Sequence, residues 1–279
     1  MLSRMLMNSK GKGRIVADGK YILTSKDVIK RFGGLTAVNK MTVNIERGRI
    51  VSIIGPNGAG KTTFFNAISS LYHCEEGTIE FEGQRIEKMH PYEITTLGMA
   101  RTFQNIRLFS GMTVVENIMV GAYTRLKQNP IQAVFRTASF KEEESKAQAR
   151  AQELMEYVGL KNVGNELAGS LPYGAQRRVE IARALASEPK LLLLDEPAAG
   201  MNPSESEHAL NLFRRIRDEL GITILLIEHD MKVVMNISEH IYVMDHGEQI
   251  AEGQPKEISS NPQVIEAYLG KGAAGTTTH

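Results

Sequence analysis

The segment that most limits what this chain can fold into is a glycine-rich stretch, residues 55–63, which reads GPNGAGKTT. It fits the pattern Gly, four residues, Gly, Lys, Ser/Thr, in which backbone N–H groups can enclose phosphate oxygens. An apolar strand-like run, IVSII, precedes it and a helical pattern follows, as that pattern requires. The predicted phosphate-binding residues are Gly55, Pro56, Asn57, Gly58, Ala59, Gly60, Lys61, Thr62 and Thr63.

Two side chains of this loop have a predicted chemical role. Lys61 can reach the β- and γ-phosphates of a bound nucleotide, and the Thr62 hydroxyl can ligate Mg²⁺. A chance match to the letters is the alternative, and the order of strand, loop and helix disfavours it. The sequence therefore predicts a site for a nucleoside triphosphate.

A second element, LLLLDEP at 191–197, supplies carboxylates. Its continuous apolar run is typical of a buried parallel strand. Asp195, at the end of that strand, is placed to hold Mg²⁺ through water, and Glu196 could orient and deprotonate an attacking water. Two ordinary strand-end carboxylates are the alternative, which loses weight beside a phosphate-binding loop in the same chain.

Composition disfavours several other classes of protein. The formal net charge is +1 over 279 residues, so no sequence-wide charge attracts nucleic acid or lipid, and we expect no nucleic-acid partner. The longest apolar runs, such as ITILLI, are far shorter than the roughly 18–20 residues of a membrane span, so a membrane role would come through a partner. The single cysteine, Cys74, cannot form an internal disulfide, which fits a reducing compartment.

The chain has strand-rich flanks around a helical middle. Strand patterns fill 21–85, with one helix near Lys61, and alternating strands and helices return after residue 190. The segment at roughly 90–180 is predicted to be mostly helical. We therefore expect an α/β core formed by both flanks, with a helical lobe inserted between them.

Two helices carry recognisable ends. Ser139 and Glu142 have the spacing of a capping box, which predicts a helix that starts with Ser139 as its cap. A second helix is predicted with Asn202 as its cap, Pro203 in its first turn and Gly221 just beyond its last turn.

Many phosphate-loop folds share the motifs above, so other residues must decide the class. A GTPase would need Asn-Lys-x-Asp downstream of the loop, whereas the only Asn-Lys pair, at 39–40, precedes it. A small nucleoside kinase has no reason to carry the stretch SLPYGAQRRVEIARAL at 170–185. That stretch starts a helix but contains no evident nucleophile, metal ligand or general base.

With this stretch, the chain resembles the ATP-binding subunits of ABC transporters over roughly residues 21–270. The resemblance implies an α/β P-loop ATPase cassette with a RecA-like core, an antiparallel β subdomain and a helical subdomain inserted at roughly 90–180. It also implies ATP and Mg²⁺ as cofactors. Independently of the resemblance, residues 1–20 are rich in Lys and Arg and have no apolar core of signal-peptide length, so we expect a flexible tail there, with contact to acidic lipid headgroups as the alternative. A second flexible segment is expected at 271–279. The family signature, Leu-Ser-Gly-Gly-Gln, corresponds here to Leu171, Pro172, Tyr173, Gly174 and Ala175.

Cassettes of this family work as dimers, in which the signature helix of one subunit completes the ATP site on the phosphate loop of the other. The N–H groups near Gly174 and the helix dipole would then face the γ-phosphate of the partner's ATP. This would explain why the chain builds a helix start where no chemistry of its own takes place.

Four further positions match the family one by one. Gln104, in ARTFQN, matches the glutamine that joins the core to the helical lobe and senses Mg²⁺ and water. His229, in IEHD, matches a switch histidine that contacts the γ-phosphate, and AGMN at 199–202 matches a loop that crosses the dimer interface. Phe32 lies 29 residues before Lys61, where the family has an adenine-stacking ring, although each match alone is also compatible with a structural role. The resemblance thus implies catalytic roles for Lys61, Gln104, Glu196 and His229, and Mg²⁺ contacts from Thr62, Gln104 and Asp195.

The signature departs from the family pattern at three positions. Pro172 replaces a serine and has neither hydroxyl nor N–H, Tyr173 replaces a glycine, and Ala175 replaces a glutamine. A proline in the first helical turn should leave the helix intact, but the lost donors should weaken the hold on the partner's ATP by about 1–3 kcal/mol. Such asymmetry suits a heterodimer better than a homodimer.

The segments ARTFQNIRLFSGMTVVENIMVG, PYGAQRRVEIARAL and DEPAAGMNP closely resemble the ATPases of branched-chain amino-acid importers, of the LivG type. The implied partners are a second, LivF-type ATPase, two membrane permease subunits and an extracytoplasmic substrate-binding protein. The implied location is peripheral, at the cytoplasmic face of the plasma membrane. The alternatives are the ATPase of a urea, amide or other amino-acid importer, a non-transport cassette protein, and an inactive nucleotide-binding scaffold, which Glu196 disfavours.

Overall fold

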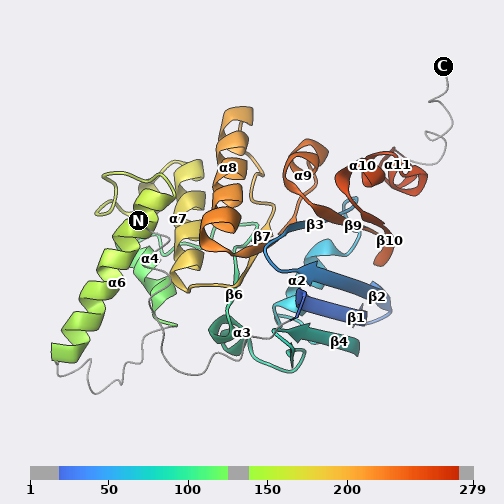
Figure 1. Cartoon of the computed structure of the whole chain (residues 1–279), viewed down its shortest axis with the longest axis horizontal. Coiled ribbons are helices and arrows are strands. Elements are labelled where there is room, and N and C mark those ends of the chain that lie inside the picture. The colour runs from blue at the N-terminus through green and yellow to red at the C-terminus, as the bar shows by residue number, and fades with distance from the viewer. Residues whose placement is uncertain (1–18, 125–137, 270–279) are drawn as a thin grey trace. The chain divides into compact units, whose positions relative to one another are not determined.

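A computed structural model describes residues 19–124 and 138–269 of the chain (Figure 1). The terminal segments that were predicted to be flexible lie outside the described residues, apart from Gly19 and Lys20. Within the described part, no helix is long and apolar enough to cross a membrane.

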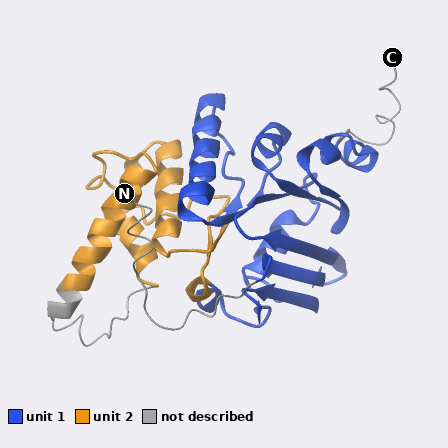
Figure 2. Ribbon diagram, viewed as in Figure 1, with its two compact units in different colours: residues 1–94, 193–279 blue, residues 95–192 orange. Residues whose placement is uncertain are grey.

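The chain divides into two compact units, which Figure 2 colours separately. Unit 1 combines residues 1–94 and 193–279, and unit 2 contains residues 95–192. The two distant segments of unit 1 come together because β3, from the first, pairs with β8 and β9, from the second. The phosphate-loop segment and the Asp195–Glu196 pair therefore lie in the same unit.

Unit 1 contains an antiparallel sheet of four strands, in the order β2 (Leu35–Glu46), β1 (Tyr21–Phe32), β4 (Glu76–Phe81) and β5 (Gln84–Arg85). The predicted strand at 21–32 coincides with β1. The β1–β2 hairpin runs from the pair Tyr21–Glu46 to the pair Phe32–Leu35 at its turn. An antiparallel sheet was expected from the family resemblance, and the structure confirms it.

A second sheet has the strand order β10 (Glu248–Gly253), β9 (His240–Asp245), β3 (Ile50–Ile54), β8 (Thr223–Ile227), β7 (Leu191–Asp195) and β6 (Met99–Arg101). The boundary between the two units falls within β7. Strand β3 is parallel to both β8 and β9, so the carboxyl ends of these three strands lie at one edge of the sheet. Every residue of β3, β7 and β8 is buried, as their continuous apolar sequences predict.

The described residues of unit 1 form the helices α2 (Lys61–Ile68), the first turn of α3 (Pro91–Leu97), α8 (Pro203–Leu220), α9 (Met231–Ile237), α10 (Pro255–Ser259) and α11 (Pro262–Leu269). The predicted ends of α8 are confirmed: the Asn202 side chain accepts the Glu205 N–H at 2.9 Å, and Gly221 has a left-handed backbone with φ of +67°. The last two helices pack on the sheet through one apolar cluster, made of Ile54, Val234, Ile241, Val243, Ile258 and Val264.

Unit 2 contains β6, α4 (Val114–Ala122), α6 (Ala138–Tyr157), the 3₁₀ turn η1 (Ala168–Ser170) and α7 (Tyr173–Ala186). Two sequence predictions need correction here. Ser139 belongs to the helical residues of α6 and not to a cap position before them. Pro172 is the N-cap residue of α7 and not part of its first turn, since its ψ of 151° is extended. The prediction of a mostly helical middle also missed β6, which is only three residues long.

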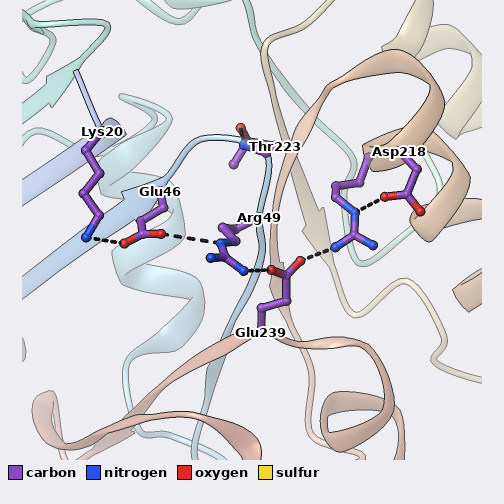
Figure 3. A network of polar contacts seen from close by, with 8 residues as sticks. Lys20, Glu46, Arg49, Asp218, Thr223 and Glu239 are labelled. Carbon is purple, nitrogen blue, oxygen red and sulfur yellow. Dashed lines mark hydrogen bonds and ion pairs between the residues drawn. The ribbon is translucent and has the colours of Figure 1, made fainter. Parts of the chain in front are cut away.

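The amino ends of β3 and β9 carry a network of ion pairs, shown in Figure 3. Glu239, just before β9, pairs with Arg49, just before β3, and with Arg217, near the end of α8. Glu46, at the end of β2, lies 3.5 Å from Arg49 and 2.7 Å from the Lys20 ammonium. The network joins both sheets and α8 at the edge of the second sheet opposite to the carboxyl ends of β3 and β8.

Candidate nucleotide-binding site

The phosphate-loop segment, residues 55–63, connects the carboxyl end of β3 to α2. Gly60 starts the helix with φ of +95°, and a Cβ at this position would lie 2.2 Å from the Ala37 carbonyl oxygen, so only glycine fits. The Lys61 ammonium donates hydrogen bonds to the carbonyl oxygens of Gly55 at 2.7 Å and of Pro56 at 2.9 Å. The loop is therefore closed on itself around the lysine.

The amino end of α2 has the features of an anion site. No side chain caps the helix at Gly60, so its first N–H groups remain available to an outside acceptor. A Cβ at Gly58 would meet no other atom within 4 Å, so the loop leaves open space there. Burial lowers the pKa of Lys61, while the charges of Glu196 and Asp195 oppose that shift. A cation, a helix amino end and open space are what a phosphate chain requires.

Carboxylates from the end of β7 lie in the same unit. Asp195 is the last residue of β7 and is 2% exposed. Glu196 follows in a left-handed conformation with φ of +46°, and its N–H donates to the Ile227 carbonyl oxygen at the end of β8 at 3.0 Å. Its Oε2 lies 3.6 Å from Nδ1 of His229, which extends from the end of β8 with about half of its side chain exposed.

The geometry adds Glu228, which the sequence analysis missed. This carboxylate is 1% exposed; its Oε1 accepts the Ala198 N–H at 2.9 Å and its Oε2 accepts the His229 N–H at 3.3 Å. Burial raises the pKa of Glu228, although the two N–H groups and the His229 charge act in the opposite direction. Glu228 therefore holds the backbone that follows Glu196 against the backbone of His229. A charged residue at the end of the apolar run ITILLI was the signal that could have identified it.

Phe32 presents an exposed aromatic ring at the β1–β2 turn, with 44% of its surface accessible. The ring of Tyr72 stands nearly perpendicular to it, with 5.3 Å between the centroids. The Lys30 ammonium lies 5.1 Å from the Phe32 centroid and pairs with Glu75 at 2.6 Å. These neighbours hold the Phe32 ring in place, and the ring remains open to solvent, as a stacking surface for a base requires.

The remaining predicted residues, Gln104 and 171–175, lie in unit 2. No side chain caps α7 at Pro172, so its first N–H groups remain open to an external acceptor. Tyr173 is 46% exposed, whereas Leu171 is buried and fixes the entry to the helix. Arg177, one turn into α7, donates a hydrogen bond to the Gln104 carbonyl oxygen at 2.7 Å. Unit 2 thus brings Gln104 and the predicted signature together through a residue that the sequence analysis did not single out.

Two of the three predicted magnesium donors, Thr62 and Asp195, lie in unit 1, whereas the third, Gln104, lies in unit 2. The described residues contain no group of three or more His, Cys, Asp or Glu side chains that could hold a metal ion alone. Thr62 offers an exposed hydroxyl at the start of α2, and Asp195 a carboxylate at the end of β7. Mg²⁺ prefers such oxygen donors and commonly completes its shell with substrate phosphates and water. The donor set therefore fits a magnesium ion that arrives with a nucleotide.

The parallel strands β9, β3 and β8, the phosphate loop after β3 and the carboxylates after β7 define a P-loop nucleotide-binding cassette. Residues 38–199 match the family described as ABC transporter, and residues 248–274 match the one described as branched-chain amino acid ATP-binding cassette transporter. The chain belongs to the ABC transporter ATP-binding family.

Similar proteins cover almost the whole chain. The high-affinity branched-chain amino acid transport ATP-binding protein BraF of Pseudomonas aeruginosa is 46% identical over 90% of this chain and 98% of its own length. Its counterpart LivG of Escherichia coli is 45% identical with the same two coverages. Among solved structures, the ADP conformation of MJ1267, an ATP-binding cassette of an ABC transporter, has a TM-score of 0.79 at 34% identity and covers 91% of this chain and 100% of its own.

Proposed function

We propose that this chain binds and hydrolyses Mg-ATP as the energising subunit of an importer for branched-chain amino acids. The observation that carries the proposal is the meeting of Lys61, Glu196 and His229 in one unit, at the loops that follow β3, β7 and β8. Two relatives named as branched-chain amino acid transport ATP-binding proteins, each covering 90% of the chain, support the cargo.

In this proposal, the chain's residues divide the work on ATP. The N–H groups at the start of α2 and the Lys61 ammonium hold the phosphates, and the Phe32 ring stacks on the base. Thr62 and Asp195 would hold Mg²⁺, with Gln104 as a further contact; the ion supplies charge that offsets the phosphates. Glu196 accepts a proton from the attacking water, and His229 orients the γ-phosphate.

We further propose that the second half of the active assembly is another ATP-binding cassette. A solved relative supports this: the ATP-binding cassette MJ0796, 26% identical over 84% of this chain with a TM-score of 0.72, is a dimer in a post-hydrolysis state bound to ADP and Pi. The signature residues 171–175 would face the partner's ATP, and Pro172 contributes no N–H there. An unlike partner with a fuller signature suits this asymmetry.

The remaining parts of the assembly are two membrane permease subunits and an extracytoplasmic binding protein, with this chain at the cytoplasmic face of the membrane. The chain would be expressed with these subunits, placed in lipid vesicles, and assayed for ATP-dependent uptake of labelled leucine and labelled urea. Uptake of leucine that stops with Glu196→Gln supports the proposal. Uptake of urea alone would assign the alternative cargo, and recovery of the chain on ribosomes or DNA without permeases would overturn the transport function.

A further inference from the structure

Arg177 is a cation buried inside unit 2, with 1% of its surface exposed. Its Nη1 donates to Glu180 Oε2, one turn along α7, at 2.9 Å. The same nitrogen donates to the Phe103 carbonyl oxygen at 2.5 Å, and the Phe103 N–H donates back to Glu180 at 3.3 Å. The ion pair and the backbone of residue 103 therefore form a closed ring of hydrogen bonds.

The second terminal nitrogen, Nη2, joins two of the predicted functional segments. It donates to the Gln104 carbonyl oxygen at 2.7 Å and to the Tyr173 hydroxyl at 3.1 Å. The guanidinium carbon also lies 5.7 Å from the centroid of the Tyr173 ring. One planar group thus holds the backbone of Gln104 and the side chain of a signature residue at fixed positions.

A guanidinium is suited to this task because its donors point in fixed directions from one rigid plane. A lysine ammonium in the same place would be a single point charge and could not serve four acceptors in that geometry. The buried pair also resists separation, since removal of either partner leaves an uncompensated charge in the interior. The segment 103–104 and the first turn of α7 are therefore expected to move together.

We infer that Arg177 is a positioning residue that couples the two ATP sites of the assembled dimer, because it ties Gln104 to Tyr173. This inference rests on the proposed function, in which Gln104 serves the ATP held by this chain and the signature serves the ATP held by the partner. A shift of the signature, caused by the partner's nucleotide, would be transmitted to Gln104 through Arg177. Tyr173, at a position where the family signature has a glycine, supplies the hydroxyl for this connection.

The test uses the full assembly with a partner cassette that has been made unable to hydrolyse ATP, so that only the site on this chain turns over. In that assembly, Tyr173 does not belong to the ATP site that turns over, because the signature of this chain faces the ATP held by the partner. We expect Tyr173→Phe to lower kcat at the working site about fivefold through loss of one hydrogen bond. Arg177→Lys should lower kcat by about tenfold or more, with the KM for ATP changed less than about twofold.

Arg150→Lys is the matched control, since Arg150 and Glu153 form an i,i+3 ion pair at 3.0 Å in the same unit, on α6 and not on α7. This variant should keep kcat within about twofold, because the pair is partly exposed. Tyr173→Phe removes only a hydroxyl and should fold, so the test can still be made if the Arg177→Lys variant does not fold. A kcat for Tyr173→Phe equal to that of the unmodified chain would overturn the coupling, as would a parallel fall in ATP binding and thermal stability without a separate effect on kcat.

Failure of this inference and failure of the proposed function give different results. When the unmodified assembly hydrolyses ATP and loses that activity with Glu196→Gln, the proposed function holds, and the Tyr173→Phe result decides the coupling alone. An assembly whose hydrolysis survives Glu196→Gln would overturn the proposed roles in catalysis, and the coupling with them.

Discussion

Nδ1 of His229 lies 3.6 Å from Oε2 of Glu196, although the two residues extend from the ends of different strands. The hydrogen bond from the Glu196 N–H to the Ile227 carbonyl oxygen, 3.0 Å long, fixes the two strand ends beside each other. The proposed base and the proposed phosphate sensor are therefore held near each other by backbone pairing between the two strand ends.

The first prediction concerns Glu196 itself. Glu196→Gln should lower kcat of the assembled complex by at least about a hundredfold, because an amide cannot accept the proton of the attacking water. The Kd for a fluorescent ATP analogue should stay within about twofold, since phosphate binding depends on Lys61 and the helix amino end. Measured turnover and binding on the same preparation separate the two effects. Unchanged turnover would exclude Glu196 as the base.

The second prediction concerns Phe32 as the surface for the base. Phe32→Ala should weaken ATP binding by roughly tenfold, because stacking of a base on an aromatic side chain contributes about 1–3 kcal/mol. Phe32→Tyr keeps the ring and should bind normally. Competition by inorganic tripolyphosphate, which has no base, should be the same in all three proteins. A weaker hold on tripolyphosphate in Phe32→Ala would indicate a general loss of structure.

The third prediction concerns the ion-pair network of Figure 3. Glu239→Gln breaks pairs with Arg49 and Arg217 and should lower the free energy of unfolding by about 1–2 kcal/mol at low salt. In about 1 M salt the loss should shrink, because screening then acts within about 3 Å. Denaturant titrations at both salt concentrations measure it. Glu219→Gln, in a pair with Arg215 whose side chains are each 48% exposed, is the control and should cost less than about 0.5 kcal/mol.

The fourth prediction concerns pH and Glu228. Burial raises the pKa of this carboxyl above its ordinary value of 4.5, so the folded state holds the proton more tightly than the unfolded chain does. Its favourable contribution is present below that ordinary value and is lost as the pH rises through the raised pKa. Glu228→Gln removes this loss. The variant should therefore gain stability relative to the unmodified chain as the pH rises from about 4.5 through the raised pKa, in denaturant titrations. A difference in the free energy of unfolding between the two proteins that does not change with pH would show that folding leaves the pKa of Glu228 unshifted.

The fifth prediction concerns Cys74, the single cysteine. Burial, followed by the charge of Glu75, raises the pKa of its thiol from 9.0 to about 11. At about pH 8 the thiolate fraction is then about a hundredfold smaller than in an ordinary cysteine, and alkylation should slow by a similar factor. Mass spectrometry after a timed exposure to iodoacetamide, with and without denaturant, measures this. Equal rates in both conditions would contradict the shifted pKa.

Much of the fold followed from local sequence chemistry. The continuous apolar runs predicted β3, β7 and β8, and the capping residues Asn202 and Gly221 fixed both ends of α8. These features were readable because each depends on a few adjacent residues. Strand β6 could not be predicted in the same way, since its three residues pair with β7, which is distant in the sequence. Hydrogen bonds from the N–H groups of residues 190 and 191 hold Gly98, the residue before β6.

The candidate site divides in a similar manner. Short sequence motifs contain four of the site residues, so their roles could be proposed before their positions in the fold were known. These residues are Lys61, Asp195, Glu196 and His229. Glu228 and Arg177 are different, because nothing near them in the sequence shows that one holds the Ala198 N–H and the other the Gln104 carbonyl. Their importance depends on partners 30 and 73 residues away, which only the folded chain brings close.

The match at residues 248–274 includes helices that share the apolar cluster of Ile54 and Val243, so this C-terminal part cannot be treated as an appendage. A chain shortened to end at Gly253 would expose Ile54, the residue before Gly55, to solvent. Such a chain is expected to aggregate before its nucleotide binding or hydrolysis could be measured. Tags and fusions are therefore better attached after α11 than in place of it.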